Sequence, residues 1–179
     1  SHLKHDKLII RNHFGDCTNY LEFNNYNNVI IALLNKKASV AAIPFPNRQN
    51  KFWLRVAQSK TINIIGAIPF IVHKKPIFLL LSEQKMEYSS FNKIFIFLKT
   101  KKNILRKIKS YLISNNFYFN QSYNLDAEYS YVLFSTNVSS EKTIEDKINL
   151  INNEKKFNFS LKAKVIGGYA VPEKDDKNV

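Results

Sequence analysis

Apolar positions in the second half of the chain follow an alternation of strand-like and helix-like patterns. A run of continuous apolarity comes first, then a lysine-rich amphipathic segment, then two alternating segments joined by a short polar turn at 125–128. The pattern predicts six elements in the order strand, helix, strand, strand, helix, strand: 94–98, a helix ending at Ser114, 116–124, 129–136, 140–152 and 160–166. This order is the split βαβ arrangement of a ferredoxin-like sandwich, with two helices on one face of a four-stranded antiparallel sheet.

The first half of the chain also predicts alternating helices and strands, with less regular spacing. The predicted elements are a helix at 5–14 ended by Gly15, a strand at 17–23, a helix at 25–37, a strand at 39–45, a helix at 49–58, a strand at 61–65 continuing through 66–70, and a strand at 77–81. Residues 39–45 are almost entirely apolar, which favours burial on both faces, as in a parallel sheet. The helix at 25–37 is then the expected right-handed crossover between parallel strands.

A polar segment at 83–90 separates the two halves and is interpreted as a linker. We therefore predict an α/β lobe over 1–86, a ferredoxin-like domain over 91–172 and a charged tail over 173–179. The length of 179 residues suits one compact domain or two small ones.

The composition narrows the class of protein. A hydrophobic content of 45% supports a true core, and no apolar run approaches the ~20 residues of a membrane span. The one cysteine, Cys17, excludes an internal disulfide framework and a cysteine-based zinc site, so a reducing cytoplasm is the expected setting. No segment predicts a metal site or a cofactor site.

The net charge of +13 raises the question of nucleic-acid binding. Arginine, which is preferred for forked phosphate and base contacts, contributes only four residues, and lysine is spread along the whole chain. We interpret the charge mainly as a solvated lysine surface and do not expect a nucleic-acid partner. If the chain binds RNA, four tyrosines are candidates for an aromatic platform under the bases. If it does not, they are expected in the core or at a dimer interface. These are Tyr118, Tyr123, Tyr129 and Tyr131.

Two groups of residues are candidates for binding an anionic ligand. Arg11, His13 and Gly15 stand at a predicted helix end, where side-chain donors and an approachable backbone can hold an anion. The other group follows the strand at 39–45, where ligands gather in open α/β sheets: Arg48, Trp53 and Arg55. An arginine beside an indole suits an aromatic carboxylate. The competing interpretation makes Gly15 a simple helix stop, Trp53 a core residue and the arginines solvated.

Several short motifs resemble one family. The run from Ala163 to Pro172 (AKVIGGYAVP) is similar to the closing strand of the ACT regulatory domain of prephenate dehydratases, and to the end of alphaproteobacterial proteins known as chorismate mutases. In the latter, a helical mutase domain precedes a dehydratase-like region. Arg11-Asn12-His13-Phe14-Gly15 resembles the start of that region, and Val40-Ala41-Ala42-Ile43-Pro44 resembles its proline-ended strand. Trp53 and the segment 67–70 follow in the order that the resemblance implies.

The chain also departs from this family. It has no Thr-Arg-Phe segment, which acts on prephenate in the dehydratases, and the matching place reads Lys75-Pro76-Ile77-Phe78. The second dehydratase lobe, the Glu-Ser-Arg-Pro phenylalanine-binding segment and the mutase helices have no counterpart here. Dehydratase chemistry is therefore not expected.

The resemblance implies a reduced periplasmic-binding-protein-like βα lobe followed by an ACT-like sandwich. It implies a regulatory or ligand-binding role in aromatic amino-acid biosynthesis, with an aromatic amino acid or shikimate-pathway acid as ligand. A homodimer and an associated chorismate mutase domain are the expected partners. The alternatives are residual activity on chorismate or prephenate, for which His13 and Asp16 are the nearest acid–base pair, and nucleic-acid binding.

Overall fold

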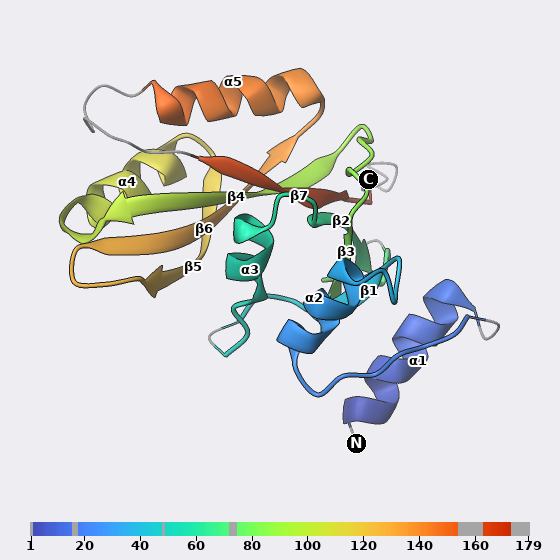
Figure 1. The fold of residues 1–179 in the computed structure, drawn as a ribbon. Coiled ribbons are helices and arrows are strands. Elements are labelled where there is room, and N and C mark those ends of the chain that lie inside the picture. The colour runs from blue at the N-terminus through green and yellow to red at the C-terminus, as the bar shows by residue number, and fades with distance from the viewer. Residues whose placement is uncertain (1, 16–17, 48, 72–74, 154–162, 173–179) are drawn as a thin grey trace.

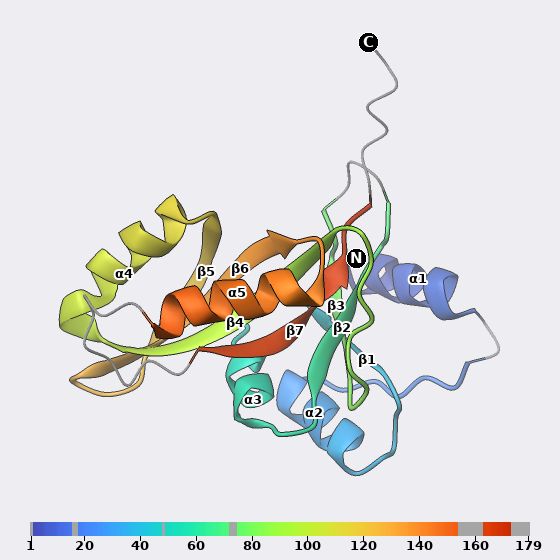
Figure 2. The same ribbon diagram turned by 90° about the horizontal axis from the view of Figure 1, so that it is seen from above.

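A computed structural model describes residues 2–15, 18–47, 49–71, 75–153 and 163–172. These residues form a mixed α/β fold with five helices and one curled seven-stranded sheet of order β1-β3-β2-β7-β4-β6-β5 (Figures 1 and 2). The helices are α1 (His2–Phe14), α2 (Tyr26–Leu34), α3 (Phe52–Gln58), α4 (Lys102–Ser114) and α5 (Glu141–Asn152). The strands are β1 (Ala41–Pro44), β2 (Asn63–Ile68), β3 (Phe78–Ser82), β4 (Asn92–Lys101), β5 (Phe117–Asn124), β6 (Tyr129–Val138) and β7 (Lys164–Ala170).

The second half of the chain confirms the predicted order of strand, helix, strand, strand, helix, strand. Its strands lie in the order β7-β4-β6-β5, and every neighbouring pair is antiparallel. The pairing of β4 with β6 is the longest in the sheet and runs from Asn92↔Val138 to Lys101↔Tyr129. The predicted turn between β5 and β6 is also present.

The two faces of β4 carry different partners because successive side chains point to opposite sides of a strand. Ile94, Ile96 and Leu98 are buried beneath α4 and α5, and we call this side the α4–α5 face. Phe95 and Phe97 point the other way, toward the cluster that contains α2 and α3, and we call that side the α3 face. Figure 1 shows α4 and α5 above the sheet and α3 below it.

The first half is antiparallel, which corrects the expectation of a parallel sheet. β1 pairs with β3, and β3 pairs with β2, in antiparallel register. Residues 18–25 form no strand, so α2 is not a crossover helix, and the helix that connects β1 to β2 is α3. The apolar sequence of β1 has another cause: Ala41 and Ile43 face α2 and α3, and Ala42 packs with the cluster under α1.

β7 joins the two halves into one sheet. It pairs antiparallel with β4 and parallel with β2, where Gly167 lies opposite Ile64. The strand predicted at 160–166 extends further along the chain, since β7 runs to Ala170 and includes both Gly167 and Gly168. Gly167 has φ +104°, and a side chain there would overlap the backbone of Ile64. The proposed division into two domains stays a prediction, and the sheet runs across it.

In the part of the chain that the structure describes, no helix combines the length and apolarity needed to cross a membrane.

Candidate functional site

The predicted anion site at the end of α1 is a well-formed helix terminus. Gly15 adopts φ +82°, and its N–H donates to the carbonyl of Arg11 at 2.7 Å, so glycine ends this helix as predicted. The Tyr20 hydroxyl donates to the Gly15 carbonyl at 2.6 Å, and the Arg11 guanidinium lies 5.9 Å from the centre of the Tyr20 ring. His13 is exposed and its ring meets the edge of Phe14.

Trp53 is a core residue, as the competing interpretation of the sequence expects. Its side chain is fully buried, its ring packs near Phe97, and its indole Nε1–H donates to Oε1 of Gln121 at 2.8 Å. Because the ring is enclosed by α3 and the sheet, it offers no face to a ligand in this structure. Trp53 instead connects α3 to β5.

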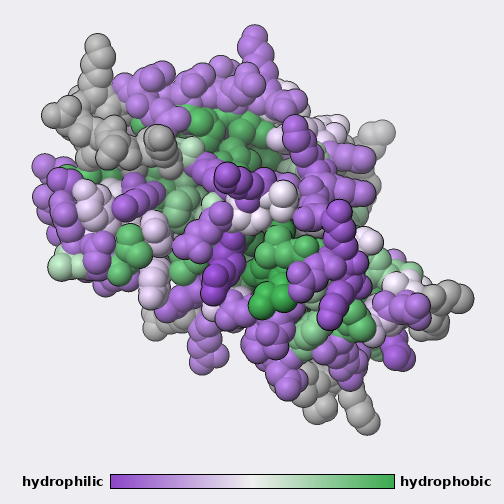
Figure 3. Space-filling view, viewed as in Figure 1, coloured by the Kyte–Doolittle hydropathy of each residue, from purple (hydrophilic) through white to green (hydrophobic). Residues whose placement is uncertain are grey.

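Arg55 lies on the exposed side of α3 and borders a groove between α2 and α3. The groove holds about 320 Å³ and is lined by residues of both helices and of the turn after α3: Asn27, Ile30, Ile31, Leu34, Arg55, Gln58 and Ser59. Ile31 and Leu34 are 51% and 48% exposed, so both side chains present apolar surface to the groove. Figure 3 shows hydrophobic surface over α2, bordered by hydrophilic residues.

The chemistry of this groove suits a small acid with an apolar body. The Ile31 and Leu34 side chains provide an apolar floor, and the Arg55 guanidinium provides donors in the forked geometry that matches a carboxylate. None of the groove's lining residues is acidic.

A lysine from β7 contacts the end of α3, whose residues Gln58 and Ser59 line the groove. Lys164 of β7 donates from Nζ to the carbonyls of Ala57 at 2.8 Å and Ser59 at 2.6 Å. These are carbonyls that the end of a helix leaves without an intrahelical partner, so Lys164 caps α3 and ties it to β7. Burial lowers the pKa of the Lys164 ammonium.

The structure separates the predicted binding residues into two places. α1 packs on the side of β2 and β3 that carries Ile68, Phe78 and Leu80, whereas Arg55 and Trp53 belong to α3 on the opposite face. Arg11, His13 and Gly15 therefore do not share a site with Arg55. Arg48 and Asp16 lie outside the described residues. Within those residues no group of three or more His, Cys, Asp or Glu side chains could hold a metal ion.

The apolar floor of the groove is the part that sequence reasoning missed. The 3.6-residue period predicts Val29, Ile30, Leu33 and Leu34 on one buried face, but Leu34 is exposed and Ile31 lies beside it in the groove. A signal was present, because residues 29–34 are apolar without interruption and one helix face cannot bury all of them. Such a helix leaves apolar side chains exposed unless a second surface covers them.

No protein-family model matches this chain, and no curated protein matches it. Its structure is similar to the X-ray structure of a prephenate dehydratase from Streptococcus mutans, with a TM-score of 0.57 and 19% sequence identity. The match covers 84% of this chain and 84% of that chain. At this identity the likeness concerns the fold, and it extends over both halves of the chain.

Proposed function

We propose that this chain is a ligand-binding protein related to prephenate dehydratase, and that it binds an aromatic amino acid or a related acid of aromatic amino-acid biosynthesis. The ligand's carboxylate pairs with Arg55, and its ring packs on Ile31 and Leu34 in the groove between α2 and α3. The observation that carries this proposal is the exposed arginine beside an exposed apolar floor, on a fold shared with a prephenate dehydratase.

The lining of the groove favours binding over catalysis. Proton transfer at neutral pH requires a positioned acid or base, most often His, Asp, Glu, Lys, Tyr or Cys. The groove is lined by Asn, Ile, Leu, Arg, Gln and Ser side chains, which contain no such group. A regulatory role is consistent with this lining. In this proposal the half containing α4 and α5 is ACT-like, two copies of the chain pair, and the chain works with a chorismate mutase domain.

The groove also offers a physical means of regulation. α2 and α3 both pack on the sheet through the same buried cluster, but the groove between them is open. A ligand in the groove contacts both helices and reduces their relative motion. Because a ligand stabilises the state it prefers, binding here favours one arrangement of α2 and α3 over others.

The test is calorimetric titration of phenylalanine, tyrosine, tryptophan, prephenate and chorismate into the wild-type chain and two variants. Arg55→Gln removes the forked cation in the groove, and we expect binding to weaken about tenfold or more, because a hydrogen bond to a charged group contributes roughly 1.5–3 kcal/mol. Arg11→Gln removes the other described arginine candidate, on the opposite side of the sheet, and is the matched control.

The outcomes separate the two predicted sites. Loss of binding in Arg55→Gln with normal binding in Arg11→Gln supports the groove. The reverse result moves the carboxylate site to the end of α1. If none of the five acids binds the wild-type chain, the proposal is wrong.

A further inference from the structure

The α3 face of strands β4, β5 and β6 carries a row of aromatic rings that the proposed ligand groove does not use. Strand register places Lys99, Tyr131 and Tyr123 side by side across the three strands, and Lys101 beside Tyr129 in the next row. Phe97 lies one row further along β4, with its ring centre 5.0 Å from that of Tyr131. We call Phe97, Tyr123, Tyr129 and Tyr131 the tyrosine face.

Lysine side chains lie over these rings. The Lys51 ammonium is 4.4 Å from the centre of the Tyr123 ring, and the Lys99 ammonium is 4.5 Å from that of Tyr129. Further along the same face, Lys93 lies 5.5 Å from the ring of Tyr118. β4, β5 and β6 contain no aspartate or glutamate, and the lysines that lie over the face come from β4 and from Lys51 at the start of α3.

Helices leave much of the tyrosine face uncovered. α4 and α5 occupy the other side of these strands, and α3 reaches the face only at its start, with Trp53 at Phe97 and Gln121 and Lys51 at Tyr123. In Figure 1 none of the described helices lies below the far ends of β5 and β6. Tyr123 is 37% exposed, and Tyr129 and Tyr131 are half-buried.

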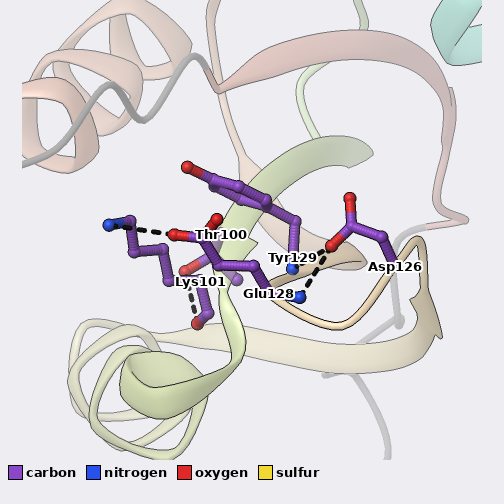
Figure 4. A network of polar contacts seen from close by, with 5 residues as sticks. All are labelled: Thr100, Lys101, Asp126, Glu128 and Tyr129. Carbon is purple, nitrogen blue, oxygen red and sulfur yellow. Dashed lines mark hydrogen bonds and ion pairs between the residues drawn. The ribbon is translucent and has the colours of Figure 1, made fainter.

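The outer end of the face is held in place by a polar network (Figure 4). One Asp126 carboxylate oxygen accepts the backbone N–H groups of Glu128 and Tyr129, each at 2.7 Å. Glu128 forms an ion pair with Lys101 at 3.2 Å. The network holds the backbone of Tyr129 in place. Both acidic side chains of the β5–β6 turn are paired in it, Asp126 with the turn's own backbone and Glu128 with Lys101.

We propose that the tyrosine face binds single-stranded nucleic acid, with bases stacked on Tyr123, Tyr129 and Tyr131 and phosphates held by Lys51 and Lys99. Unpaired bases stack on aromatic side chains of an open four-stranded sheet, and a surrounding row of cations follows the backbone. A duplex does not fit this scheme because its bases are already stacked on each other. A second copy of the chain is a poorer occupant, since two basic faces meet with like charges together.

The folded structure makes the net charge a stronger argument for nucleic-acid binding than the sequence does. In the sequence the lysines are spread along the whole chain, which favours a solvated surface. Folding gathers Lys51, Lys93 and Lys99 on one face, each within reach of a tyrosine ring. This face is separate from the groove between α2 and α3, so the proposal does not depend on the proposed ligand.

The test is fluorescence anisotropy with labelled 12-nucleotide oligo(U) and oligo(dT), a 12-base-pair DNA duplex, and unlabelled heparin as a competitor. For both single strands we expect stronger binding than for the duplex, with log K falling by about 0.7 per phosphate contacted as log salt rises. Tyr123→Leu should weaken single-strand binding about fivefold or more, because it removes one stacking surface.

Matched variants distinguish this face from general charge. Tyr88→Leu removes a tyrosine that is 42% exposed and lies outside the tyrosine face, and it should leave affinity unchanged. Lys99→Gln should reduce affinity and the salt slope more than Lys107→Gln on the outer side of α4. Circular dichroism melting confirms that each variant is folded. The proposal is wrong if both lysine variants have equal effects, if the duplex binds as well as the single strands, or if Tyr123→Leu keeps the wild-type affinity. It is also wrong if no single strand binds at 50 mM salt.

Discussion

Two parts of the sheet are built with the same connectivity. In the first, β1 leads through α3 to β2, and β2 turns back into β3, which lies between the other two. In the second, β4 leads through α4 to β5, and β5 turns back into β6, again in the middle. All the pairings inside both units are antiparallel. The chain therefore uses one strand–helix–strand–strand unit twice, with α5 and β7 completing the second.

The two units differ in how their faces are covered. The first has short strands with helices on both sides, α2 and α3 on one and α1 on the other. The second has strands of eight to ten residues with α4 and α5 on one side, and its α3 face is covered by a helix only at the start of α3, near Lys51 and Trp53. The same connectivity therefore gives two different surfaces. In the first unit it forms a closed core beside a groove, and in the second it leaves an aromatic sheet face open.

The largest effect is expected where the two units join. Gly167→Ala places a methyl group into the backbone of Ile64 and requires a residue with a side chain to adopt φ +104°. We expect a loss of at least about 3 kcal/mol of unfolding free energy, or no folded protein, because both backbone strain and overlap are involved. Chemical denaturation monitored by circular dichroism measures this loss.

Gly66→Ala is the matched control in β2. Its added methyl group meets the Cδ1 end of Leu80 at 3.3 Å, where a flexible side chain can move. A change of no more than about 1 kcal/mol is expected. If the two glycine variants lose equal stability, β7 does not depend on glycine to join the units.

The contact from Trp53 to Gln121 joins the units a second time. Gln121→Leu leaves the buried indole N–H without its acceptor, which costs about 1–3 kcal/mol of unfolding free energy. Trp53→Phe in the same background removes the unpaired donor, so the double variant should lose less stability than the sum of the two single variants. Strict additivity in urea unfolding would show that the contact carries no coupling.

Tyr169 gives a pH-dependent measure of the same junction. Its ring packs between Phe45 of the first unit and Phe95 of the second, and burial raises its pKa to about 12. A tyrosine whose pKa is higher in the folded than in the unfolded state stabilises the fold below pH 10 and loses this contribution as pH rises toward 12. At pH 11 the loss is on the order of 1 kcal/mol for a shift from 10 to about 12.

Comparison of Tyr169→Phe with the wild-type chain isolates this loss. Between pH 8 and pH 11 the wild type should lose more stability in urea unfolding than Tyr169→Phe does. Parallel curves for the two proteins would exclude Tyr169 as the source.

The second unit was predictable from sequence because its signals are local and agree with one another. The amphipathic stripe of α4 and the Ser140 cap of α5 each fix one element: Ile108 and Leu112 are buried, and the Ser140 side chain accepts the N–H of Thr143. Short connections then leave few topologies. The order of elements followed from these signals.

The first unit and the site were less predictable because their determinants are distant in sequence. Continuous apolarity in β1 reports burial on both faces but not strand direction, and the direction is set by pairing with β3. Whether Trp53 faces a ligand or the core depends on Gln121 and Phe97, which no local pattern connects to it. The tyrosine face likewise exists only through register between β5 and β6.

The smallest expected effect compares two turns of the same geometry, one in each unit. After β1, Asn47 Oδ1 accepts the N–H groups of Gln49 and Asn50, and before β6, Asp126 Oδ1 accepts those of Glu128 and Tyr129. Only the second acceptor is a carboxylate, and its backbone hydrogen bonds, first from Tyr129 and then from Glu128, lower the pKa of Asp126. A carboxyl with a lower pKa in the folded state stabilises the fold above its unfolded pKa of 3.8 and loses this contribution as pH falls through the folded value.

Asp126→Asn keeps an acceptor that cannot titrate, as in the Asn47 turn, so the free energy of unfolding between pH 6 and pH 3 should be slightly less pH-dependent than in the wild type. An NMR titration of the Asp126 carboxyl measures the shift directly, and a midpoint at or above 3.8 would show that the two turns are equivalent in charge as well as in shape.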